Sequence, residues 1–285
     1  MTILRQKMIN AMKLRGFSER TQDSYVMAIA AMARFYKEAP DKISKEKVQA
    51  YLLQLWDTQK LSWSSCNVVV SALRFFYVQL LGIQEMRLWI PPRKVESKLP
   101  EILSKEEVER ILSALENPKH RTLLMTTYAG GLRVSEVVNL QVKDIDSQRM
   151  TIRVKQGKGR KDRYTILSRK LLVQLRDYWK IQRPPVYLFP GTKLNEPLCR
   201  QSALLIYHKA KSKAGITKEG GIHSLRHAFA THMLEAGVDL RTIQLMMGHS
   251  SIRSTMRYLH VTSKHMGTII SPLDLLDLPD GRLLQ

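Results

Sequence analysis

The chain has 285 residues, of which 44% are hydrophobic, and its 46 Lys and Arg against 25 Asp and Glu give a formal net charge of +21. This length allows one large or two medium domains with their own cores. The most apolar stretch, residues 68–81, is interrupted by Arg74 and Gln79, which argues against a membrane span, and no signal peptide is visible. The strong basic excess favours a nucleic acid as the partner.

Two cysteines, Cys66 and Cys199, lie far apart in the sequence. We interpret both as reduced thiols in the core of a cytoplasmic protein, because disulfides are rare in that compartment. This predicts a cytoplasmic protein.

Apolar residues recur at intervals of three and four through the N-terminal part of the chain, which predicts four amphipathic helices. The first ends at Gly16 and the fourth at Gly82, and Ser44 stands where an N-cap is needed. Their apolar stripes are Leu4, Met8 and Met12; Tyr25, Ile29, Met32 and Phe35; Val48, Leu52 and Leu55; and Val69, Leu73, Phe76 and Leu80. Four helices of this length form a small bundle.

A proline-bracketed, charged segment at 91–100 separates this bundle from the rest of the chain. Beyond it, Ser104 and Glu107 have the spacing of a capping box that opens the next helix. We therefore predict an N-terminal helical domain at 1–92, a linker at 93–103 and a second domain at 104–285. The second domain should be helical around a small antiparallel β-hairpin, so the fold class is mostly α with a minor β part (α+β).

A double glycine, Gly130-Gly131, precedes Arg133 between two apolar helical patterns. Glycine permits the tight turn that places Arg133 at the start of a helix, where its side chain can serve a phosphate. Glu136 follows three residues later, and a simple ion pair between Arg133 and Glu136 is the alternative interpretation.

Residues alternate between apolar and polar at 150–154 and again at 163–167, on both sides of a glycine-bearing turn. This pattern predicts a β-hairpin. Lys158 stands at its tip between Gly157 and Gly159, and it can protonate a leaving oxygen if neighbouring arginines lower its pKa. Taken singly, the segment is no more than a basic turn, and its spacing does not match a phosphate-binding P-loop.

A set of charged and hydroxyl-bearing residues lies near the C-terminus: His223, Arg226, His249 and Tyr258. His223 and Arg226 lie three residues apart, so a helix at 224–234 places both on one face. A second short helix is expected at 239–246, and a third carries Tyr258.

These residue types suit the cleavage of a phosphodiester without a metal. Arg226 can hold the non-bridging oxygens, because a guanidinium forks onto phosphate and stays charged. His223 and His249 can add a donor or take up the proton of the nucleophile, since histidine titrates near neutrality. Tyr258 can attack phosphorus and form a covalent ester that stores the bond energy.

Each residue also has a plainer interpretation. His223 and His227 are four apart, but the glutamate of a zinc-protease signature is absent and no cysteine or carboxylate completes the set, so we expect no metal. A lone tyrosine at helical spacing is usually core or interface. Five further histidines are interpreted as structural or solvent-facing: His208, His227, His232, His260 and His265.

Taken together, five motifs occur in the order and spacing of the tyrosine recombinase (phage integrase) family: Gly131-Leu-Arg133-Val-Ser-Glu136, Gly157-Lys158-Gly159, His223-Ser-Leu-Arg226-His227, Met247-Gly248-His249-Ser250 and Tyr258. The chain most resembles the compact Xer-like members. The resemblance implies that Lys158 is the general acid, Tyr258 the nucleophile and Glu136 a supporting residue. The residues implied to bind and activate the scissile phosphate are Arg133, His223, Arg226 and His249.

The resemblance also implies a reaction and its partners. DNA strands would be exchanged by two transesterifications, through a 3′-phosphotyrosine and a free 5′-hydroxyl, with no cofactor. Double-stranded DNA would be the partner, bound by a homotetramer or heterotetramer, with the N-terminal bundle as a SAM-like core-binding domain. The leucine-bearing segment 271–278 would dock into a neighbouring protomer or fold back on its own domain. Two alternatives stay open: a type IB topoisomerase and a non-catalytic DNA-binding regulator.

Overall fold

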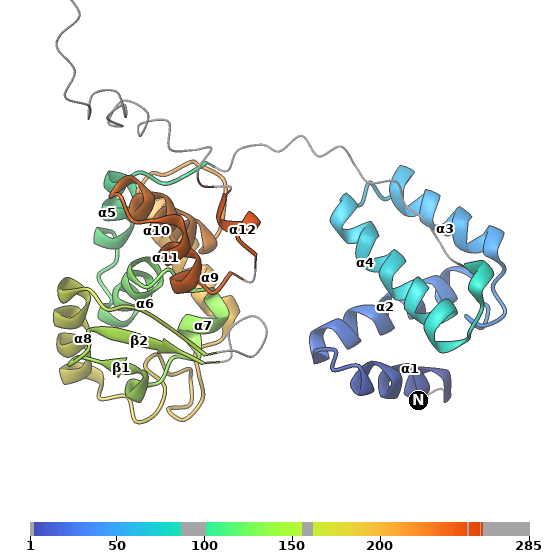
Figure 1. Ribbon diagram of the computed structural model, residues 1–285, viewed down its shortest axis with the longest axis horizontal. Helices are drawn as coiled ribbons and strands as arrows, with labels where there is room; N and C mark the ends of the chain where they lie inside the picture. The colour runs from blue at the N-terminus through green and yellow to red at the C-terminus, as the bar shows by residue number, and fades with distance from the viewer. Residues whose placement is uncertain (1–2, 87–100, 156–161, 250, 257, 259–285) are drawn as a thin grey trace, which may run out of the picture. The chain divides into compact units, whose positions relative to one another are not determined.

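The computed structural model describes residues 3–86, 101–155, 162–249, 251–256 and 258. The chain divides into two compact units, residues 1–97 and 98–285 (Figure 1). Each unit has its own hydrophobic core. The linker predicted at 93–103 lies largely outside the described residues, so the domain limits stay a prediction. No helix in the described ranges has both the length and the apolar character needed to cross a membrane.

The described part of the N-terminal unit is helical, as predicted (Figure 1). Its elements are α1 (Ile3–Leu14), α2 (Glu19–Tyr36), α3 (Lys45–Asp57), α4 (Trp63–Arg74), the π-helical turn η1 (Phe75–Leu80) and the 3-10 turn η2 (Gln84–Met86). Ser44 caps α3 by accepting the backbone N–H of Lys47, as expected. Phe35 differs from its predicted place in the buried stripe: it is 46% exposed, because the buried face of α2 continues from Met32 to Tyr36.

The second unit is helical around a small sheet, which confirms the predicted fold class. Its helices are α5 (Lys105–Ser113), α6 (Pro118–Ala129), α7 (Val134–Val138), α8 (Arg169–Gln182), α9 (Arg200–Lys213), α10 (His223–Glu235), α11 (Leu240–Met247) and α12 (Arg253–Met256). Its strands are β1 (Ile145–Asp146), β2 (Thr151–Val154) and β3 (Arg163–Ile166), and the 3-10 turn η3 (Val142–Asp144) precedes them. The predicted capping box of Ser104 and Glu107 opens α5.

The sheet has the order β1-β2-β3 with antiparallel neighbours. β2 and β3 form the predicted hairpin, in which Ile152 pairs with Thr165 and Val154 with Arg163. The sequence does not predict β1, because two residues are too few to show an alternating pattern. The hairpin tip, residues 156–161 with Lys158, lies outside the described residues.

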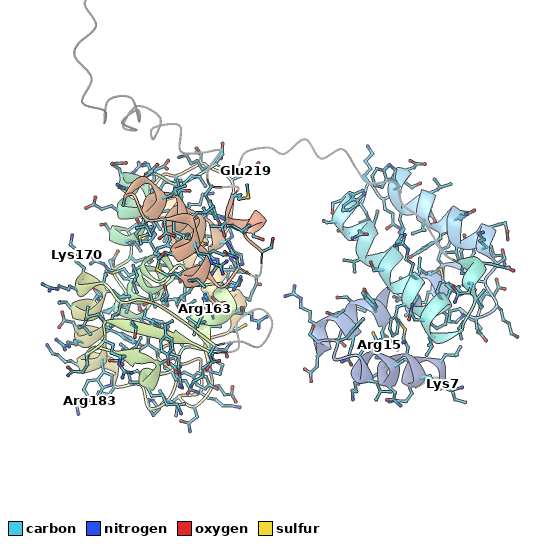
Figure 2. All side chains as sticks on the ribbon, viewed as in Figure 1. Lys7, Arg15, Arg163, Lys170, Arg183 and Glu219 are labelled. Carbon is cyan, nitrogen blue, oxygen red and sulfur yellow. The ribbon has the colours of Figure 1, made fainter. Side chains whose placement is uncertain are left out.

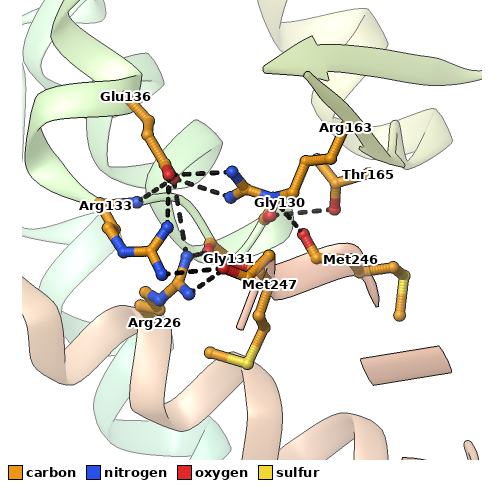
Figure 3. Close-up of polar contacts among 10 residues, drawn as sticks. Gly130, Gly131, Arg133, Glu136, Arg163, Thr165, Arg226, Met246 and Met247 are labelled. Carbon is orange, nitrogen blue, oxygen red and sulfur yellow. Dashed lines mark hydrogen bonds and ion pairs between the residues drawn. The ribbon is translucent and has the colours of Figure 1, made fainter. Parts of the chain in front are cut away.

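Elements far apart in the sequence meet around one place in this unit. α10 packs against α6 and α11, and α11 also contacts β3. The turn between α6 and α7, the start of β3, the first turns of α10 and the end of α11 are therefore neighbours (Figure 3). These are the segments that carry the predicted site residues.

Two expectations need correction. The helix predicted to carry Tyr258 is shorter, because α12 ends at Met256 and the N–H of Tyr258 bonds to the carbonyl of Thr255 (3.0 Å) in a turn. This turn directs the tyrosine ring into a small apolar cluster with Phe229, instead of along the helix surface. Cys66 is buried as expected, but Cys199 is exposed at the N-cap of α9 and is not a core thiol.

Candidate active site

The turn between α6 and α7 accepts only glycine at Gly131. Its φ of +58° lies in the left-handed region, and a Cβ there would lie 2.4 Å from Cδ1 of Phe229 on α10. The Gly131 carbonyl accepts a hydrogen bond from Nη1 of Arg226 (2.6 Å), which also comes from α10. The turn then delivers Arg133 to the N-cap of α7. The close approach of α10 to this turn therefore brings two predicted arginines together.

Glu136 is the centre of the arginine cluster (Figure 3). Its carboxylate accepts Nη1 of Arg133 at 2.6 Å and the backbone N–H of Arg133 at 2.8 Å. Arg163, from the start of β3, pairs with both oxygens at 2.9 and 2.8 Å, and Nη1 of Arg226 lies 3.6 Å away. Because one buried carboxylate holds three guanidiniums, the two predicted phosphate-binding arginines are fixed relative to each other.

The same cluster sets the charge states of its members. Burial opposes the charged form of Glu136. The hydrogen bonds and charge of Arg163 outweigh this effect, with a smaller contribution from the backbone N–H of Arg133, and together they lower the pKa of Glu136 to about 2. Burial, followed by the charge of Arg133, lowers the pKa of Arg226 to about 9. Glu136 is therefore ionised and Arg226 is still charged at neutral pH.

The C-terminal end of α11 supplies the other anchors. A helix leaves its last carbonyls unpaired, and its dipole makes that end favourable for cations. Met246 accepts Nε of Arg163 (2.7 Å), and Met247 accepts Nη2 of Arg226 (2.6 Å). The carbonyl of Gly248, the left-handed cap of this helix with φ +62°, accepts Nη2 of Arg133 at 3.2 Å. The three arginines thus bind three successive carbonyls.

Both predicted histidines lie at this cluster. His223 is exposed on the first turn of α10, and desolvation, with the charges of Arg226 and Arg133, lowers its pKa, so its imidazole is neutral at pH 7. His249 follows the α11 cap directly and is half-buried. Its Nδ1 pairs with Oγ1 of Thr255, a fully buried residue of α12, at 2.8 Å. That bond fixes the ring orientation of His249.

Tyr258 lies on the α10 side of the site. Its side chain is 2% exposed, and its hydroxyl pairs with Nδ1 of His227 at 2.8 Å. His227 directly follows Arg226 on α10. The structure therefore brings the predicted nucleophile to the helix that carries the arginine, with the hydroxyl turned inward.

Of the predicted site residues, Lys158 lies outside the described residues, and the structure places the other six around one cluster: Arg133, Glu136, His223, Arg226, His249 and Tyr258. Sequence reasoning missed Arg163, Thr255 and the contact of His227 with Tyr258. Strand alternation was a usable signal for Arg163, because it shares a face with the buried Thr165, and a charge on a buried face needs a partner.

A second histidine interpreted as structural from the sequence, His232, has a specific contact. His232 pairs through Nδ1 with the hydroxyl of Tyr128 at 2.8 Å, between α10 and α6. It serves helix packing, away from the arginine cluster. In the described ranges, no group of three or more His, Cys, Asp or Glu side chains is arranged to hold a metal ion.

Comparison with known proteins assigns the family. Residues 101–265 match the phage integrase family, and residues 4–86 match its N-terminal SAM-like domain. A putative integrase/recombinase, y4qK of Sinorhizobium fredii, is 44% identical over 285 residues, covering 98% of this chain and 91% of the relative. Tyrosine recombinase XerA of Pyrococcus horikoshii is 32% identical over 272 residues, covering 93% and 92%.

Solved structures agree with this. The crystal structure of XerA recombinase has a TM-score of 0.55 at 26% identity, covering 93% of this chain and 95% of that one. A lambda integrase tetramer bound to a Holliday junction has a TM-score of 0.71 at 20% identity, covering 90% and 76%, which is a likeness of fold.

A unit that gathers paired arginines, histidines and a tyrosine around one buried carboxylate has the side chains that phosphoryl transfer needs. The chain belongs to the phage integrase family of tyrosine recombinases. It is accordingly a site-specific recombinase that cuts and rejoins DNA strands. The recombinase relatives favour this function over the topoisomerase and regulator alternatives.

Proposed function

We propose that Tyr258 attacks the scissile DNA phosphate and forms a 3′-phosphotyrosine, while Arg133 and Arg226 hold the non-bridging oxygens. The proposal is supported by the position of Arg133 and Arg226 on the carboxylate of Glu136. This arginine pair lies next to the turn that bears His249 and next to α10, whose His227 pairs with the hydroxyl of Tyr258. The side chain of Arg133 is 22% exposed. Its described contacts engage Nη1 and Nη2 once each, so N–H groups remain for a phosphate.

His223 and His249 complete the phosphate site. His223 is neutral at pH 7, so it is suited to take up the phenol proton as Tyr258 attacks. His249, whose ring is held through Nδ1 by Thr255, is the proposed donor to a phosphate oxygen. Each donor aimed at the charge that develops in the transition state contributes roughly 10²- to 10³-fold in rate.

Tyr258 has to change position before it reacts. With 2% of its side chain exposed and its hydroxyl on His227, the phenol is inaccessible to a DNA phosphate. DNA binding therefore has to displace the turn after α12 so that the hydroxyl reaches the arginine pair. The attack then forms the phosphorus–tyrosine oxygen bond and breaks the bond to the 5′ oxygen, which leaves as a 5′-hydroxyl.

Lys158 is the proposed general acid that protonates the leaving 5′ oxygen. Replacing that oxygen by sulfur gives a leaving group that needs no proton, because a thiol is far more acidic than an alcohol. Lys158→Ala should slow cleavage of ordinary DNA by about 10²- to 10⁴-fold and leave cleavage of the 5′-phosphorothiolate near the wild-type rate.

The matched control is Lys155→Ala, in the same hairpin, where the lysine pairs with Asp144 at 3.0 Å. This variant should cleave both substrates at the wild-type rate. Equal losses on both substrates for Lys158→Ala would assign the lysine a binding role in place of proton transfer.

The second half of the reaction reverses the first. The 5′-hydroxyl of a partner strand attacks the phosphotyrosine and releases Tyr258, so bond energy is conserved and no cofactor enters the proposal. Exchange of two duplexes requires four cleavages, which supports a tetramer on DNA, homomeric or with a related partner. The likeness to the lambda integrase tetramer agrees with that assembly. In a bacterium this reaction takes place in the cytoplasm, on the nucleoid.

The DNA target is found with the chain itself. Nicked duplexes with a randomised core are incubated with the protein in EDTA, denatured, and the covalently captured fraction is sequenced. A recovered consensus supplies the substrate for the rate measurements above. Its complex with the protein should have the mass of four subunits and two duplexes. A complex that stays at two subunits on one duplex under recombining conditions would contradict the tetramer.

A further inference from the structure

Arg163 has no role in the reaction proposed above, yet it is the most completely engaged arginine of the cluster. Its three guanidinium nitrogens all bond to the protein, at 2.9 and 2.8 Å to Glu136 and at 2.7 Å to the carbonyl of Met246. Its side chain is 9% exposed and lies inside the unit, whereas Lys170 and Arg183 project from the surface (Figure 2). Arg163 therefore binds protein groups through Nε, Nη1 and Nη2, whereas the hydrogen bonds of Arg226 involve Nη1 and Nη2 alone.

The position of Arg163 links the strand to both halves of the phosphate site. Its aliphatic part passes beneath Gly248, where a Cβ would lie 2.7 Å from Cδ of Arg163. The carbonyl of Gly248 accepts a hydrogen bond from Arg133, and His249 is the next residue. Arg163 thus contacts the carboxylate that holds Arg133 and Arg226, and also the turn that delivers His249.

Charge gives this contact a further consequence. Glu136 lies against Arg133 and Arg226, and without a third partner its negative charge would offset one of the two positive charges meant for the phosphate. Arg163 pairs with both carboxylate oxygens. Three guanidiniums and one carboxylate leave a net charge of +2. A phosphodiester carries about one negative charge and its five-coordinate transition state about two, so the site matches the transition state better.

We propose that Arg163 is a positioning residue of the active site, which neutralises Glu136 and ties β3 to the end of α11, so that Arg133 and Arg226 keep their charge for the scissile phosphate. The inference rests on the proposed function. Lysine cannot replace Arg163, because one ammonium does not span two carboxylate oxygens and a carbonyl in one plane.

The test compares two substrates in single-turnover cleavage by the full chain at saturating DNA. One carries the ordinary scissile phosphate. The other carries a methylphosphonate, in which a methyl group replaces one non-bridging oxygen and removes one negative charge. Arg163→Gln and Arg163→Lys should lower cleavage of the phosphate by about 10²- to 10³-fold. On the methylphosphonate, the loss of cleavage rate should be at least tenfold smaller than on the phosphate, because that substrate needs less positive charge.

Arg153→Gln is the matched control. Arg153 lies on the neighbouring strand β2 and pairs with Asp144 at 3.4 Å, so its removal deletes an arginine and an ion pair of the same sheet without touching Glu136. Cleavage of both substrates should stay at the wild-type rate. An equal loss on both substrates for Arg163→Gln would show that Arg163 only holds the fold, and no loss on either would remove it from the site.

A second variant gives a readout on ordinary DNA. Adding Glu136→Gln to Arg163→Gln removes the uncompensated carboxylate and restores the net charge of +2. The double variant should cleave about tenfold faster than Arg163→Gln alone, and a slower double variant would overturn the charge argument. Failure of the proposed function itself is seen separately, since wild-type protein would then give no adduct that depends on Tyr258.

Discussion

The buried carboxylate of Glu136 predicts a large, pH-dependent loss of stability in Glu136→Gln. Its surroundings lower the pKa of Glu136 from 4.5 to about 2. At about 1.36 kcal/mol per pKa unit, the charged form gains about 3 kcal/mol from the folded structure. In Glu136→Gln this contribution is absent and three guanidiniums face each other uncompensated. We expect a loss of about 3 kcal/mol at pH 7, or roughly 6 to 12 °C in Tm for a unit of this size.

The pH dependence follows from the sign of the shift. Because the folded pKa lies below the unfolded one, the stabilisation is present above pH 4.5 and is lost between pH 4.5 and 2. At pH 3 the difference in unfolding free energy between wild type and variant should narrow to about 1.4 kcal/mol.

The assay is unfolding in urea, monitored by hydrogen exchange with mass spectrometry. Only peptides of the second unit are analysed, so that the N-terminal unit does not contribute to the measured free energy of unfolding. Glu196→Gln is the control, since Glu196 pairs with Lys193 at 2.9 Å with both side chains exposed. It should change stability by less than about 0.5 kcal/mol. A Glu136→Gln loss below about 1 kcal/mol at pH 7, or a difference that does not narrow at pH 3, would refute the reasoning.

Three further predictions follow from the geometry. Gly131→Ala should lose about 3 kcal/mol, from a left-handed φ of +58° and a Cβ 2.4 Å from a phenylalanine ring, whereas Gly215→Ala, with φ +65° and open space, should lose about 1 kcal/mol. The same exchange assay measures both, and equal losses would contradict the packing argument. Thr255→Val should lower the cleavage rate by about tenfold with DNA affinity unchanged, because His249 loses its hydrogen bond. Single-turnover kinetics and a binding titration measure the two quantities, and a loss of DNA affinity alone would contradict this role of Thr255. The cleavage rate should be constant near pH 7 and fall below pH 6.5 as His223 gains a proton, and this fall should be absent in His223→Gln. If the pH–rate profiles of both proteins fall in the same way at low pH, His223 is not the proton acceptor.

Local signals predicted most of the described elements of the fold. Ser44 and Ser104 were predicted as caps because a hydroxyl before an amphipathic stripe satisfies the first unpaired N–H groups, and both accept them in the structure. The hairpin followed from alternation at 150–154 and 163–167. β1 escaped prediction because its pairing depends on β2 and hardly on its own two residues.

For the site, too, local patterns predicted the residues but not their arrangement. Arg133, His223, Arg226, His249 and Tyr258 are recognisable because their motifs carry chemistry in fixed spacing. Their mutual geometry depends on contacts between distant segments, which no local pattern encodes.

Arg163 is the clearest example of such a contact. It joins β3 to the carbonyl of Met246, 83 residues away, and to Glu136, 27 residues away. Likewise, the inward position of the Tyr258 hydroxyl depends on His227, which the sequence offered only as one histidine among eight. The roles of Arg163 and His227 depend on the fold, which brings the first turns of α10 and the C-terminal end of α11 next to the α6–α7 turn.

The central claim is that Tyr258 forms a covalent bond with DNA, and one measurement tests it directly. Wild-type chain and Tyr258→Phe are incubated in EDTA with the nicked, randomised duplexes, denatured, digested and analysed by mass spectrometry. Wild type should give a DNA adduct, with the modified peptide carrying a 3′-phosphate ester on Tyr258, and the variant should give none. An adduct that survives in Tyr258→Phe, or that maps to another residue, would contradict this claim.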